Sequence, residues 1–219
     1  MDFKNGSGKA ALLLAAVALA VLLFNSVQIS RLGSFGSAST YSGVVPSSAY
    51  SYNIDVIPKG IPSIYGKELG VSFDSISASD AALADATISR LGRLDIDIQL
   101  SGAELKRYVA IVSRISCEYC CGAASIIFEN GEPACGCAHS YAMRGLAKYL
   151  LTKHGSEFSD DAVLEELGKW KTLFFPAQMV KKAEVLSGQG VELNYINLAS
   201  NKYRGAEKGA GSGSMVGGC

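Results

Sequence analysis

The most apolar part of the chain lies near its N-terminus, where residues 10–24 form an unbroken run of 15 apolar residues. Lys4 and Lys9 precede this run, and apolar residues continue with interruptions to Ile29. A membrane-spanning helix needs about 20 apolar residues. The pattern predicts an N-terminal transmembrane helix within residues 1–32 that acts as a signal anchor and leaves the C-terminal body outside the cytoplasm. A cleaved signal peptide and a buried helix are the alternatives.

Two segments of low complexity flank the predicted globular part. Residues 33–51 are mostly Gly, Ser, Ala and Tyr, and residues 205–219 are rich in Gly and Ser. Such composition is typical of flexible linkers and tails, because it offers too few apolar side chains to form a core. We therefore expect a linker at 33–51, a globular domain at 52–204 and a flexible tail at 205–219.

The first half of the predicted domain mixes periods of two and of 3.6 residues. Apolar and polar residues alternate at 71–74 and again at 94–100, which predicts two strands. Ser79 is suited to cap a helix that runs to about residue 91, and Gly92 is suited to end it. This half therefore favours an α+β fold.

Helical spacing dominates the second half. Ser101 and Glu104 form a capping-box pattern that opens a helix reaching about residue 115. Apolar side chains at helical spacing predict a further helix at 138–153 and another from Ser159 through Trp170. Pro176 suits the first position of a last helix that ends near residue 186. We expect a mostly helical domain with a small β-hairpin at 125–137.

The charge balance limits the classes of partner. The chain has 20 Lys and Arg against 20 Asp and Glu, so it lacks the basic excess that binding to a phosphate backbone requires. It also lacks a glycine-rich phosphate loop, a Gly-x-Ser-x-Gly turn and a His-Glu-x-x-His helix. The sequence thus predicts no nucleic-acid partner, favours a binding protein over an enzyme, and identifies no protein partner.

Cysteine is concentrated in one short segment. Five of the six cysteines fall within residues 117–137, and a histidine follows two residues later. Thiolate and neutral imidazole are the ligands that zinc and other soft or borderline metals prefer. The candidate metal ligands are Cys117, Cys120, Cys121, Cys135, Cys137 and His139.

The predicted elements around these residues explain how the ligands could converge. Cys117 and Cys120 follow a helix, the predicted hairpin comes next, and Cys135, Cys137 and His139 lie where it meets the helix at 138–153. This layout resembles that of treble-clef zinc sites. We expect Cys117, Cys120, Cys135 and Cys137 to be the core ligands, with Cys121 and His139 as exchangeable ones.

Zinc is the expected metal, since four thiolates, or three thiolates and one imidazole, suit it, while copper(I) and an iron–sulfur cluster are alternatives. Six cysteines could instead form three disulfides outside the cytoplasm. A redox centre is a further alternative, because residues 117–120 resemble the Cys-x-Tyr-Cys motif of glutaredoxin-like proteins. The expected function is that of a membrane-anchored, extracytoplasmic binding protein for zinc, copper or iron. A thiol–disulfide or iron–sulfur redox protein and a structural zinc domain that mediates protein interactions are the alternatives.

Several other polar residues have simpler interpretations. Glu118, Glu129 and Glu132 flank the cluster, and we expect them to be solvated loop charges. His154 lies near a predicted helix C-terminus, where a capping role is expected. Cys219 in the tail could reach back as a mobile ligand or remain a solvated thiol.

Two segments carry a distinctive motif, since residues 115–123 read ISCEYCCGA and residues 135–143 read CGCAHSYAM. Together with NLASNKYR at 197–204, they resemble an uncharacterised family of membrane-anchored proteins from uncultivated archaea, over about residues 58–204. The resemblance implies a membrane-anchored location and a metal site. It implies no reaction.

Overall fold

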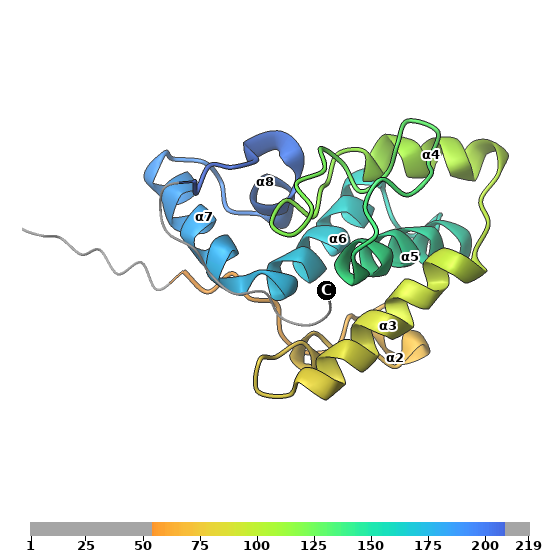
Figure 1. Ribbon diagram of the computed structural model, residues 1–219, viewed down its shortest axis with the longest axis horizontal. Helices are drawn as coiled ribbons and strands as arrows, with labels where there is room; N and C mark the ends of the chain where they lie inside the picture. Colours follow the sequence, from red (N-terminus) through yellow and green to blue (C-terminus); the bar gives the residue numbers. More distant parts are fainter. Residues whose placement is uncertain (1–53, 209–219) are drawn as a thin grey trace, which may run out of the picture. The chain divides into compact units, whose positions relative to one another are not determined.

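A computed structural model describes residues 54–208, and helices form the regular secondary structure of this part of the chain (Figure 1). No strand occurs in it, and its β pairing consists of two isolated bridges, Ile115 with Ser200 and Ile127 with Pro133. The elements are α2 (Gly66–Leu69), η1 (Phe73–Ser75), α3 (Ala81–Asp97), α4 (Gly102–Val112), α5 (Ala138–Lys153), α6 (Asp160–Phe174), α7 (Pro176–Gly188), α8 (Tyr195–Ala199) and η2 (Asn201–Tyr203). The expected α+β class is therefore wrong for this part.

Helices α3 and α5 pack closely along their length (Figure 1). A side chain at Gly145 of α5 would overlap the carbonyl oxygen of Leu91, and its Cβ would lie 2.8 Å from the Asp95 backbone nitrogen. A Cβ at Gly92 of α3 would lie 3.2 Å from the Tyr141 Cβ. Both glycines thus allow the two backbones to approach.

The strand predicted at 94–100 is wrong, because α3 continues to Asp97. The helix period continues through Ala84, Ile88, Leu91 and Asp95, all of which are buried. Asp95 occupies a core-facing position because it pairs with buried Arg144 at 2.7 Å. Because this core-facing position holds a polar residue, the spacing of apolar residues did not indicate that the helix continues. Gly92, expected to end the helix, lies inside it as a packing residue.

The strand predicted at 71–74 is also absent, since Phe73–Ser75 form a 3₁₀ turn. The Ser72 side chain accepts a hydrogen bond from the Asp74 backbone nitrogen, which stabilises this turn. Asp80, not Ser79, caps α3 through the Leu83 backbone nitrogen.

The helices predicted for the second half of the domain are confirmed. Helix α5 spans Ala138–Lys153, the Ser159 side chain caps α6 through the Ala162 backbone nitrogen, and Pro176 occupies the first turn of α7. Ser101 is the N-cap residue of α4, but its side chain makes no capping hydrogen bond. These helices were recognisable from the helical spacing of their apolar residues, with Ser159 and Pro176 marking the starts of α6 and α7.

The predicted β-hairpin at 125–137 is wrong. The Phe128 backbone nitrogen bonds to the Glu132 carbonyl, and the Ala134 nitrogen bonds to the Ile126 carbonyl, but the pairing extends no further along the arms. The preceding segment bends at Gly122, where φ is +67°, and a disulfide joins Cys121 to Cys135. The segment is therefore an irregular loop fixed by individual contacts.

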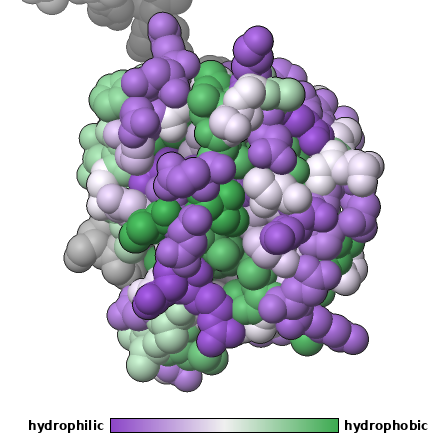
Figure 2. Space-filling view, turned by 90° about the vertical axis from the view of Figure 1, so that its right-hand side faces the viewer, coloured by the Kyte–Doolittle hydropathy of each residue, from purple (hydrophilic) through white to green (hydrophobic). Residues whose placement is uncertain are grey.

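The transmembrane helix predicted within residues 1–32 lies outside the described residues. Among residues 54–208, no helix combines the length and the hydrophobicity needed to cross a membrane. On the face shown in Figure 2, hydrophilic side chains predominate and hydrophobic ones appear in a strip between them. The core contains fully buried Trp170, Phe174 and Phe175 from α6 and the turn that follows it.

Candidate metal centre

Two segments that flank the 121–136 loop supply the candidate ligands. The first segment follows α4 and turns tightly, since the Tyr119 backbone nitrogen donates to the Cys117 carbonyl at 2.7 Å. Glu118, at the centre of this turn, has a φ of +67°, which only a few per cent of non-glycine residues adopt. This backbone turns the side chains of Cys117 and Cys120 towards each other, and their Sγ atoms are 2.9 Å apart.

The second segment is the start of α5. Cys137 is the N-cap residue of this helix, and its Sγ atom accepts a hydrogen bond from the Ser140 backbone nitrogen at 3.4 Å. His139 lies in the first turn. A helix N-terminus favours a thiolate, because the backbone N–H groups and the helix dipole both stabilise negative charge there.

The two segments bring four donor atoms together. The Sγ atoms of Cys117, Cys120 and Cys137 and a ring nitrogen of His139 all lie within 4.8 Å of one another. The Cys117 and Cys137 Sγ atoms are 3.5 Å apart. Two sulfur ligands of one tetrahedral zinc lie about 3.8 Å apart, given a Zn–S bond of about 2.3 Å. The cluster can therefore hold a metal ion after a small separation of Cys117 and Cys120.

Aromatic side chains fix the imidazole of this cluster. His139 is fully buried, and its ring centroid lies 4.7 Å from that of Phe174 and 5.1 Å from that of Phe175. Cys117 is also fully buried, whereas Cys120 and Cys137 are half-buried. The ligand set is thus enclosed on the side of α6 and closer to solvent at Cys120 and Cys137.

The remaining two cysteines of the loop form a disulfide. Cys121 and Cys135 are bonded, with their Cα atoms 6.6 Å apart. Cys135, expected as a core ligand, therefore lies in the disulfide, and His139, expected as an exchangeable ligand, completes the group of four donor atoms. The division into core and exchangeable ligands stays a prediction. Of the disulfides that the alternative interpretation expected, the described residues contain this one.

The thiols of the cluster are electrostatically unequal. Hydrogen bonding with Cys137 and burial raise the pKa of Cys117. The hydrogen bond with Cys117 lowers the pKa of Cys137 against the opposing effect of burial, and hydrogen bonds with His139 and Ser140 lower it further. Negative charge therefore concentrates on Cys137, at the helix N-terminus.

A buried charge network supports the ligand turn. The Glu118 side chain is 2% exposed and accepts hydrogen bonds from Lys171 at 2.9 Å and from Lys182 at 3.0 Å, both of which are fully buried. Burial raises the pKa of Glu118, but the two ammonium groups outweigh this effect and hold it below its ordinary value. The expectation that Glu118 is a solvated loop charge is thus wrong, whereas Glu129 and Glu132 are exposed.

Sequence reasoning missed Lys171 and Lys182. Both lie on the buried faces of their helices, with Leu167, Trp170 and Phe174 around Lys171 in α6. Burial lowers the pKa of Lys171 to about 8, although Glu118 opposes this shift. Each lysine occupies a helix position where the spacing of its neighbours predicts an apolar residue. This mismatch is the signal that could have identified both residues.

The same network also binds the end of the described chain. The Gly205 backbone nitrogen donates to Glu118 at 2.6 Å, and Lys182 lies 3.4 Å from the Glu207 carboxylate.

His154 lies at the C-cap position of α5, as expected, and contacts Glu157 and Glu68. Cys219 lies outside the described residues.

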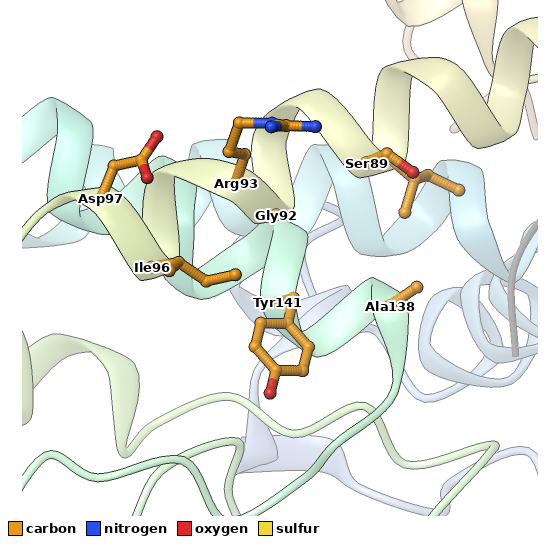
Figure 3. Close-up of a pocket in the computed structure, with 8 residues that line it drawn as sticks. Ser89, Gly92, Arg93, Ile96, Asp97, Ala138 and Tyr141 are labelled. Atoms are coloured by element: carbon orange, nitrogen blue, oxygen red, sulfur yellow. The ribbon is translucent and has the colours of Figure 1, made fainter.

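An open groove of about 460 Å³ lies between α3 and the first turns of α5 (Figure 3). Arg93, Ile96 and Asp97 line it from α3, and Ala138 and Tyr141 from α5. Ala138 stands between Cys137 and His139 in sequence, but no ligand side chain lines the groove. The groove and the metal centre are therefore separate features.

Comparison with known proteins gives no family for this chain. No protein-family model, no curated protein and no solved structure matches it.

Proposed function

We propose that this chain is a zinc-binding protein that holds one Zn²⁺ ion through Cys117, Cys120, Cys137 and His139. The observation that carries the proposal is the convergence of four donor atoms within 4.8 Å from two separate segments. Three thiolates and one imidazole form a closed tetrahedral set, which is typical of structural zinc sites. A catalytic zinc site would leave one of the four positions open.

The ion would fasten the irregular loop to the helical core. Between residues 113 and 137 the chain forms no helix or strand, and its backbone makes only scattered hydrogen bonds. One zinc ion bound by Cys117, Cys120, Cys137 and His139 ties both ends of this loop to α5. Because such a site does not exist in the unfolded chain, the free energy of zinc binding contributes directly to folding.

The disulfide supports an oxidising compartment for the folded protein. Disulfides are rare in the cytosol, where thiols are kept reduced, and persist in extracytoplasmic compartments. The bond between Cys121 and Cys135 therefore supports an extracytoplasmic location, which we include in the proposal.

Elemental analysis and chelation test this function on the full-length chain. We expect one zinc per chain after purification without added metal, and loss of the folded signal in circular dichroism when a strong chelator removes it. The variant C117S should lose the zinc, and C219S should keep it, because Cys219 belongs to none of the proposed ligands. A chain that purifies without zinc and takes up none on dialysis against Zn²⁺ contradicts the proposal.

A second candidate is a thiol–disulfide redox protein, which the 2.9 Å separation of the Cys117 and Cys120 Sγ atoms favours. Two sulfur atoms at this separation need only a small approach to form a bond. Mass spectrometry after mild oxidation distinguishes the candidates. A zinc-loaded protein should keep these thiols reduced, whereas a redox protein should form the Cys117–Cys120 disulfide reversibly and without metal.

A further inference from the structure

A second group of sulfur atoms adjoins the proposed zinc site. The Sγ atoms of Cys120, Cys121 and Cys135 lie within 4.8 Å of one another, so Cys120 belongs to both groups. The Cys135 Sγ atom also lies 3.6 Å from that of Cys137. Once the bond between Cys121 and Cys135 is reduced, three thiolates grouped this closely can bind one metal ion.

We propose that reduction of the Cys121–Cys135 disulfide creates a second metal site, in which Cys121, Cys135 and the shared thiolate of Cys120 bind a second Zn²⁺ ion. The inference rests on the proposed function, because Cys120 serves as the bridge from the first ion. The oxidised chain then carries one ion and the reduced chain carries two.

Reduction of the Cys121–Cys135 disulfide requires an external reductant that supplies two electrons. A phosphine donates two electrons to the Cys121–Cys135 bond, both sulfur atoms take protons, and the phosphine takes the oxygen of one water molecule to become a phosphine oxide. Zinc then displaces the two protons. Two thiolates and one Zn²⁺ ion add no net charge, so the second ion places no uncompensated charge beside buried Cys135.

The backbone on both sides of the disulfide is held independently of the S–S bond. Buried Arg144 donates to the Cys135 carbonyl at 2.8 Å and pairs with Asp95. Arg204 donates to the carbonyls of Gly122 and Ala123, each at 2.7 Å. The two sulfur atoms therefore stay close after the bond between them is broken, and this preorganises them for a metal ion.

The second site would differ from the first in its access to solvent. Cys121 is exposed and Cys120 is half-buried, whereas Cys117 and His139 are fully buried. Three thiolates leave the fourth position of a tetrahedral ion open. The second ion would therefore be the exchangeable one, and the chain would gain it only under reducing conditions.

Zinc stoichiometry of the full-length chain tests the inference. The protein is dialysed against Zn²⁺ with and without a phosphine reductant, and thiol titration in denaturant verifies that reduction exposes two further thiols. Elemental analysis should give one zinc per chain before reduction and two after it. The double variant C121S/C135S should give one under both conditions, and the control C219S should change from one to two like the unmodified chain.

The possible results separate this inference from the proposed function. A ratio that stays at one after complete reduction overturns the second site and leaves the first intact. A ratio of two in reduced C121S/C135S also overturns it, since the second ion then binds elsewhere. No zinc in either state overturns both proposals. The unmodified chain carries the main comparison, so the test holds even if the double variant fails to fold.

Discussion

The ammonium group of Lys171 in α6 lies 2.9 Å from the carboxylate of Glu118, which stands in the turn between two proposed zinc ligands. Neither group is accessible to solvent, since their side chains are 0% and 2% exposed. Lys182 of α7 contacts the same carboxylate. The turn that carries Cys117 and Cys120 is thus held by charges from two helices far along the chain.

Neutralising Glu118 tests the importance of this network. The variant E118Q should lower the free energy of unfolding by about 3–5 kcal/mol, because it leaves the buried ammonium group of Lys171 without its counter-charge and leaves Lys182 with Glu207 alone. Urea denaturation of the zinc-loaded protein measures the change. E129Q is the matched control at an exposed position of the same loop and should stay within about 0.5 kcal/mol. A loss below about 1 kcal/mol for E118Q, within the usual range for exposed ion pairs, would show that the network contributes little.

The close crossing of α3 and α5 predicts a strict requirement at Gly145. The variant G145A should destabilise the protein by about 1–3 kcal/mol, because the added methyl group overlaps the Leu91 carbonyl oxygen. Gly188 provides the control, since a Cβ there meets nothing within 4 Å and G188A should be neutral or slightly stabilising. Thermal unfolding compares the two variants. Equal melting temperatures would mean that the helices cross less tightly than described.

His154 predicts a pH dependence of stability. The hydrogen bond with Glu157 raises the pKa of His154 above its ordinary value of 6.5. Burial opposes this shift, and Glu68 adds to it. A pKa raised in the folded state adds stability below pH 6.5, and this contribution disappears as the pH rises through the folded-state value. Proton NMR can follow the titration, because the chain has two histidines. E157Q should move the midpoint of His154 down towards 6.5, and an unchanged midpoint would remove Glu157 as the cause.

The sequence predicted the helices that begin with strong local signals. Ser159 and Pro176 mark the starts of α6 and α7 through a side-chain cap and a fixed φ angle, both of which are properties of the residue itself. It failed where a polar residue faces the core. Asp95 interrupts the apolar spacing of α3, and its distant partners Arg144 and Lys148 supply the opposite charge at that position.

The candidate site was predictable as a set of residues but not as a pairing. Cys120 and Cys121 are adjacent in sequence, and one residue separates Cys135 from Cys137. Spacing alone therefore does not show which sulfur atoms belong to the same group. The left-handed backbone at Glu118 directs Cys120 towards Cys117, and Cys121 is bonded to Cys135. The Glu118 side chain in that turn accepts hydrogen bonds from Lys171 and Lys182, which are more than 50 residues away in sequence.

X-ray absorption at the zinc edge tests the central claim most directly. The full-length chain, with its disulfide intact and one zinc bound, should show three sulfur ligands at about 2.3 Å and one nitrogen ligand at about 2.0–2.1 Å. That result fits Cys117, Cys120, Cys137 and His139. A spectrum with four sulfur ligands, or with nitrogen and oxygen ligands alone, would contradict the proposed site.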